Sequence, residues 1–191
     1  MRHGWVYIYE SPPASTRCEE LLDRLARQGI SLADPGTGQV VRLSAIGEQI
    51  SSSRQDILRE SANSAKVSFN LYLAPSDNLY CSIEKLSNEL CREGYSLDGK
   101  TELQSSSVIE SLLHLFAMRA EDATAFALVA DRYAELHRDF HWDDFVIGSA
   151  AAPPEWPIVL AFSRSFEKIG AVPRQTYSVE EFPQYIVFRK K

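Results

Sequence analysis

Apolar and polar residues alternate most clearly in two neighbouring segments near the middle of the chain. In 67–73 (VSFNLYL) every second residue is apolar, and in 79–86 (LYCSIEKL) the alternation returns with one slip near its end. Successive side chains of a strand point to opposite faces of its sheet, so this pattern is typical of half-buried strands. The short loop 74–78 between the two segments predicts that they pair as an antiparallel hairpin.

Apolar residues recur at helical spacing in other segments. The segment 16–29 carries one apolar stripe, and 106–119 carries a broader apolar face. In the second segment Ser107 and Glu110 have the spacing of a capping box. We expect a helix in each segment and expect the helix at 106–119 to be the most buried one. The polar segment 46–63 has a weaker helical pattern.

Short runs of β-branched and aromatic residues predict further strands at 5–9, 158–162 and 184–190. The segment 123–131 (ATAFALVAD) is ambiguous, because its alanines favour a helix whereas its alternation allows a strand. This order of elements predicts an α+β fold with a mostly antiparallel sheet and helices packed on it, ferredoxin-like or related.

Length and composition are those of an ordinary globular protein. With 191 residues and 45% hydrophobic content, the chain can bury a core without disulfides. We expect residues 1–191 to form a single domain, with a Pro/Ala-rich break at 149–157 inside it. The N-terminus lacks the apolar region of a signal peptide, and no apolar run is long enough to span a membrane. The expected location is the cytoplasm.

Cysteine usage fits the same compartment. An odd number of three cysteines, without the spacing of a disulfide framework or of a zinc site, indicates reduced thiols. Cys81 falls on the apolar side of a predicted strand and is expected in the core. Cys91 borders a predicted loop, a position that allows it to be exposed.

The negative charge of the chain is concentrated in one segment. The chain has a net charge of −6. Residues 98–149 hold ten acids and four bases, which accounts for the whole excess. Such a chain repels nucleic-acid backbones, which bind through Lys and Arg, and attracts basic partners. We therefore expect no nucleic-acid partner and no membrane association.

The most conspicuous motif of that segment is ELHRDFHWDDF at 135–145. On a helix, His137, His141 and Asp144 would share one face, and two histidines one turn apart can bind a metal. However, Arg138 stands where metalloproteases of this spacing have a catalytic Glu, and a cation disfavours a bound dication. We therefore expect no metal here, and a metal-assisted hydrolase using His137, His141 and nearby carboxylates is the alternative hypothesis.

Motifs of the common catalytic classes are absent from the sequence. It has no GxSxG, no kinase signature set around the HRD triplet, and no Lys-Ser/Thr after the turn DPGTG at 34–38. We accordingly expect no catalytic residue, no cofactor and no cofactor-binding site, and an enzymatic role is the less favoured interpretation.

Class and charge together favour a non-enzymatic binding protein. Bacterial immunity proteins and antitoxins are small, often acidic proteins without catalytic motifs, and they neutralise basic toxin domains by electrostatic complementarity. We therefore predict an inhibitor of this immunity type that binds a basic protein partner. Its binding surface is predicted to contain Glu135, Asp139, Trp142, Asp143 and Asp144, with the tryptophan as the desolvated anchor. A homodimer formed through exposed aromatic residues is a further hypothesis.

Overall fold

The computed structural model describes residues 4–11, 17–131, 141–148, 153 and 156–191. These residues form two compact units. One unit combines Met1–Glu10 with Leu97–Lys191, and the other is the continuous segment Ser11–Ser96. The expectation of a single domain stays a prediction.

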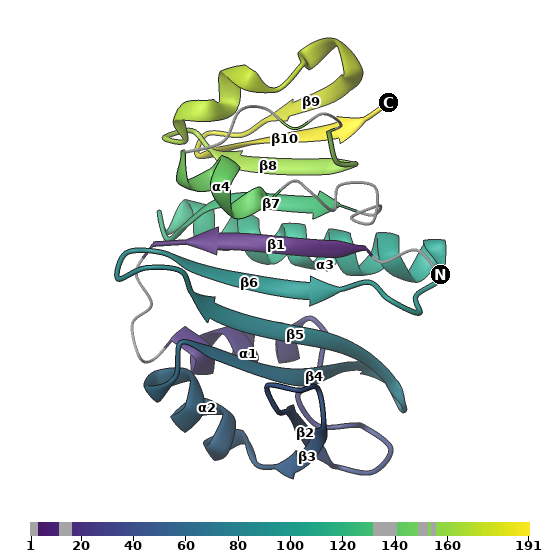
Figure 1. Cartoon of the computed structure of the whole chain (residues 1–191). Helices are drawn as coiled ribbons and strands as arrows, with labels where there is room; N and C mark the ends of the chain where they lie inside the picture. The colour runs from purple at the N-terminus through teal and green to yellow at the C-terminus, as the bar shows by residue number, and fades with distance from the viewer. Residues whose placement is uncertain (1–3, 12–16, 132–140, 149–152, 154–155) are drawn as a thin grey trace. The chain divides into compact units, whose positions relative to one another are not determined.

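The unit Ser11–Ser96 contains five strands in the order β3-β2-β4-β5-β6 among its described residues, each antiparallel to its neighbours (Figure 1). The strands are β2 (Val40–Leu43), β3 (Gln49–Ser52), β4 (Lys66–Ala74), β5 (Asp77–Lys85) and β6 (Cys91–Ser96). Two helices belong to the same unit, α1 (Arg17–Arg27) and α2 (Arg54–Asn63).

The predicted hairpin of 67–73 and 79–86 is confirmed by the pairing of β4 with β5. Phe69 lies opposite Cys81, and Leu71 lies opposite Leu79, so the alternating apolar residues of both strands share one face. All four side chains are fully buried. Their burial is the physical reason for the alternation in the sequence.

The prediction of one weak helix over 46–63 is wrong, because the segment divides into β3 and α2. Ser53 joins them and is the N-cap of α2. Its hydroxyl accepts a hydrogen bond from the backbone N–H of Asp56 at 3.2 Å, while its own N–H donates to the Asp56 carboxylate at 3.1 Å. This capping box starts the helix at Arg54, after β3 has paired with β2.

The other unit contains the strands β1 (Trp5–Glu10), β7 (Ala125–Asp131), β8 (Val159–Ser163), β10 (Tyr185–Lys190) and β9 (Tyr177–Glu181). Among its described residues they follow one another in that order, with antiparallel pairing throughout. The ambiguous segment 123–131 is therefore a strand. The helices of this unit are α3 (Glu102–Glu121) and α4 (Trp142–Ile147), and short 3-10 turns span η2 (Glu167–Ala171) and η3 (Arg174–Thr176).

Helix α3 packs on one face of these strands, and α4 lies on the other face (Figure 1). Leu112 and Leu115 of α3 are fully buried, as the sequence predicts. The predicted cap at Ser107 and Glu110 is wrong, because the helix begins earlier. Thr101 is the N-cap, and its N–H donates to the side chain of Gln104 at 2.9 Å.

The structure thus confirms an α+β fold with an antiparallel sheet and packed helices, and the narrower ferredoxin-like arrangement stays a prediction. None of the helices in the part of the chain described here is long and apolar enough to cross a membrane.

Candidate functional site

The end of the motif at 135–145 forms the short helix α4. His141 is its N-cap and makes no capping hydrogen bond with its side chain. Asp143 and Asp144 occupy the first turn, where the backbone N–H groups favour negative charge. The helix stops at Gly148, whose φ of 106° is in the left-handed region that glycine adopts without strain.

The inner face of α4 is attached to the strands by packing and by hydrogen bonds. Trp142, Phe145 and Val146, at i, i+3 and i+4, are buried. The Trp142 ring meets that of Phe145 edge-on, with centroids 6.0 Å apart, and its Nε1–H donates to Oδ2 of Asp131 at 3.2 Å. Lys168 Nζ donates to the Phe145 carbonyl at 2.8 Å and lies 4.7 Å from the centre of the Phe145 ring.

These contacts change the role expected of Trp142. Its side chain is only 5% exposed, so in this structure it fixes the helix to the strands and is not an exposed anchor. Asp143 is half-buried and accepts a 2.8 Å hydrogen bond from the hydroxyl of Tyr9. Asp131 lies inside the unit as the acceptor for Trp142, and it is 1% exposed. Asp131 and Asp143 therefore have structural partners within this unit.

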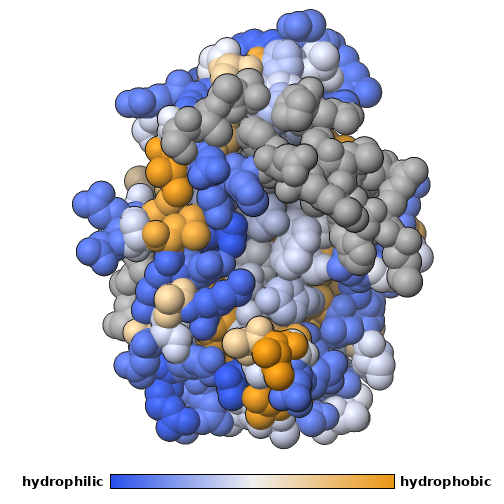
Figure 2. Space-filling view, viewed as in Figure 1, coloured by the Kyte–Doolittle hydropathy of each residue, from blue (hydrophilic) through white to orange (hydrophobic). Residues whose placement is uncertain are grey.

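The outer face of α4 carries the side chains of Asp144 and of an apolar residue. Asp144 is exposed, and the neighbouring Ile147 is 57% exposed, one of three large hydrophobic residues exposed in the described part of the chain. In the view of Figure 2, hydrophobic residues form small separate groups on a mostly hydrophilic face. Of the other predicted partner-binding residues, Glu135 and Asp139 lie outside the described residues.

The alternative metal site is not tested by the structure. His137 lies outside the described residues, and His141 is exposed at the start of α4. Within the described ranges, no group of three His, Cys, Asp or Glu side chains lies close enough to hold a metal ion.

The three cysteines are all buried thiols. Cys81 is in the core, as expected, and Cys91 at the start of β6 is buried too, with 1% exposure, although its place beside a predicted loop allowed it to be exposed. Pairing of β6 with β5 draws it inward, opposite Lys85. Burial also raises the pKa of the Cys18 thiol, an effect that a hydrogen bond with Ser61 partly offsets.

We expect none of the three thiols to react with a water-soluble disulfide reagent in the native protein, because thiolate formation and access are both disfavoured by burial. All three should titrate after denaturation in guanidinium chloride. The measurement is the absorbance of the released chromophore before and after unfolding. Rapid reaction of one thiol in the folded protein would contradict this prediction.

A second location, which the sequence did not indicate, is a hollow of about 410 Å³ within the unit Ser11–Ser96. It is lined by residues of β3 and α2, which Ser53 joins, and by Arg42 of β2. Its lining residues are Arg42, Ile50, Ser51, Ser52, Asp56, Arg59, Glu60 and Asn63.

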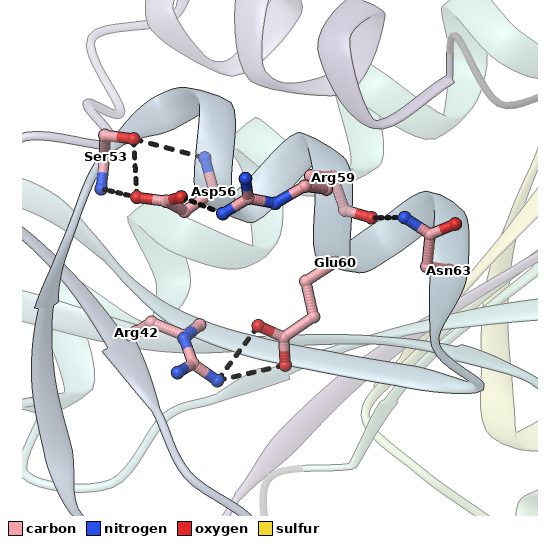
Figure 3. A network of polar contacts seen from close by, with 6 residues as sticks. All are labelled: Arg42, Ser53, Asp56, Arg59, Glu60 and Asn63. Carbon is pink, nitrogen blue, oxygen red and sulfur yellow. Dashed lines mark hydrogen bonds and ion pairs between the residues drawn. The ribbon is translucent and has the colours of Figure 1, made fainter.

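Two ion pairs line this hollow (Figure 3). Arg42 of β2 reaches Glu60 of α2, with its Nη1 at 3.1 and 2.9 Å from the two carboxylate oxygens. On α2, Arg59 Nη2 donates to Oδ1 of Asp56. The pKa of Asp56 is lowered by the hydrogen bonds from Ser53 and further by the charges of Arg59 and Arg42, so this carboxylate is ionised at neutral pH.

The spacing of the α2 residues was a signal that sequence reasoning missed. Positions 56, 59, 60 and 63 are i, i+3, i+4 and i+7, so they share one polar face of the helix, and Ile57 is buried outside that face. The strand residues Arg42 and Ile50 are brought to this face by their pairing across β2 and β3.

No protein-family model, curated protein or solved structure matches this chain. Its function has therefore to be inferred from the chemistry of its own residues.

Proposed function

We propose that this chain is a non-enzymatic cytoplasmic binding protein, an acidic inhibitor of the immunity type that neutralises a basic partner such as a bacterial toxin domain. The observation that carries the proposal is the outer face of α4, where the exposed carboxylate of Asp144 adjoins the exposed side chain of Ile147. A carboxylate attracts a cationic surface over a distance, and an apolar neighbour adds contact area that excludes water on binding.

The attachment of α4 supports this proposal. Trp142 and Asp143 on the inner side hold the helix through Asp131 and Tyr9, so the outer side chains project from a fixed backbone. A fixed binding surface loses less conformational entropy on association than a mobile one. Ile147 takes the role of apolar anchor for which Trp142 was predicted.

The net charge supports a basic partner more than a second copy of the chain. The chain carries −6 overall, so long-range electrostatics favours association with a positively charged protein. In a homodimer formed through the same face, Asp144 of one copy would approach Asp144 of the other. Like charges in an interface are unfavourable unless other contacts compensate for them.

The test begins with basic proteins that the tagged chain retains from its source cells at low ionic strength. A candidate partner should slow growth when it is expressed alone, and co-expression with this chain should restore growth. Association of the purified pair is then followed by surface plasmon resonance from about 50 to 300 mM salt, a range in which the Debye length falls from about 14 to 6 Å.

Replacing Asp144 with Asn should lower the association rate and flatten its salt dependence, because a charge at the edge of an interface acts mainly on the rate of encounter. Replacing Ile147 with Ser should instead raise the dissociation rate. Glu89→Gln is the matched control, since it removes an exposed acid in the other unit. Unchanged kinetics for both α4 variants, or equal effects of all three, would refute the role of this face.

A further inference from the structure

The hollow between β3 and α2 has an imbalance between hydrogen-bond donors and acceptors. Both oxygens of Asp56 are engaged, Oδ1 by Arg59 and Oδ2 by the N–H and hydroxyl of Ser53, at 3.1 and 2.7 Å. For Glu60, Oε1 accepts a hydrogen bond from Arg42 Nη1, and Oε2 lies 2.9 Å from the same nitrogen. The acidic side chains that line the hollow are thus already held by donors.

The two arginines, by contrast, use only a small part of their donor capacity. A guanidinium has five N–H donors on three nitrogens. Within the described part of the chain, Arg42 bonds through Nη1 and Arg59 through Nη2, each to one carboxylate. The Nε and the second terminal nitrogen of each remain for solvent or a ligand. The side chains of Arg42 and Arg59 are 26% and 73% exposed, so a ligand can reach both.

We propose that this hollow is a binding site for a small oxyanion ligand, a molecule whose carboxylate or phosphate group accepts hydrogen bonds from Arg42 and Arg59 together. The planar guanidinium forms paired hydrogen bonds with such groups, and an oxyanion supplies the acceptors that the lining lacks. This site is independent of the α4 surface and lies in the other unit.

The remaining lining residues suit the body of such a molecule. Ser51, Ser52 and Asn63 offer hydroxyl and amide groups, and Ile50 offers an apolar contact. A volume of about 410 Å³ exceeds what a carboxylate or phosphate fills and is within the range of small-molecule sites. The ligand therefore has a polar body attached to its anionic group.

The carboxylates of the hollow position the guanidiniums and also limit the affinity. Asp56 holds Arg59 and Glu60 holds Arg42, in each case through one guanidinium nitrogen. Because two acids balance two bases in the lining, the site attracts an anion through directed hydrogen bonds more than through net charge. We expect dissociation constants on the order of 1 mM for a bare anion.

The experiment titrates the ¹⁵N-labelled full chain with sodium phosphate and, separately, with sodium acetate, at constant ionic strength made up with chloride. The signals observed are the Nε–H groups of the arginines. Saturable shifts of Arg42 and Arg59 with either anion support the site, and comparison of the two titrations tells a phosphate ligand from a carboxylate ligand. Arg54 begins the same helix and pairs with Asp23 at 2.7 Å outside the hollow, so it reports any general effect of anions.

Variants with opposite expected effects separate binding from structure. Arg42→Gln and Arg59→Gln should each weaken binding by about tenfold, since each removes charged hydrogen-bond donors. Glu60→Gln should tighten it by about twofold to fivefold, because the competing negative charge is removed from a partly exposed pair. Arg54→Gln should leave it unchanged. Shifts of Arg54 equal to those of Arg42, or no saturable shift with either anion, would overturn the proposal.

Discussion

Replacing Arg119 with alanine should lower the free energy of unfolding by about 3–5 kcal/mol, the cost of leaving a buried charge without its partner. Arg119 of α3 donates to the carboxylate of Glu10 on β1 at 2.8 Å. The two side chains are only 7% and 5% exposed, so the Glu10 carboxylate is largely shielded from water. The measurement is urea unfolding at neutral pH, followed by circular dichroism.

A double variant is the control for this prediction. Replacing Glu10 with Gln and Arg119 with Met together should cost much less than Arg119→Ala alone, because neither charge then remains buried. Arg164→Ala gives the comparison with an exposed pair. Its partner Glu181 lies 3.2 Å away at the surface, and loss of that pair should cost less than about 1 kcal/mol. A similar small loss for Arg119→Ala would show that the buried pair contributes little.

Replacing Trp142 with alanine should destabilise the protein by about 3–5 kcal/mol, the range for removing a buried aromatic side chain. It should also expose the amides of α4 to faster hydrogen exchange, because this ring attaches the helix to the strands. If α4 binds the partner, the same variant should lose binding along with the helix.

The milder Trp142→Phe variant separates packing from hydrogen bonding. It keeps an aromatic ring against Phe145 but removes the donor to Asp131, so a buried carboxylate loses one hydrogen bond at a cost of about 1–3 kcal/mol. Asp144→Asn, on the exposed side of the same helix, should leave the stability within about 0.5 kcal/mol. Equal stability of Trp142→Ala and wild type would mean that α4 does not depend on this side chain.

Local pattern alone determined the elements in which burial follows a regular period. The alternation in β4 and β5 and the broad apolar face of α3 reflect one buried side of each element, and the structure confirms both. These elements can be predicted from the sequence because side-chain direction repeats every two residues in a strand and about every 3.6 residues in a helix. The same regularity predicted the α+β class.

Element boundaries and short edge elements required tertiary contacts. Helix α3 starts at Thr101 and not at Ser107, although both sites offer a hydroxyl and a polar partner three residues on, so the cap motif alone did not determine the boundary. Strand β3 has only four residues and a polar sequence, so its conformation depends on hydrogen bonding to β2. The local sequence pattern does not predict this pairing.

For the surface, too, the sequence determined some properties and the tertiary structure determined others. Composition determined the acidity of the chain and its concentration in 98–149, but it did not determine which acids reach solvent. Burial of Trp142 beside Asp131 depends on α4 folding back over β7, and the hollow of Arg42 and Glu60 depends on a strand meeting a helix 18 residues further along the chain. Such contacts join residues distant in sequence, and their free energy depends on geometry that only the folded chain possesses.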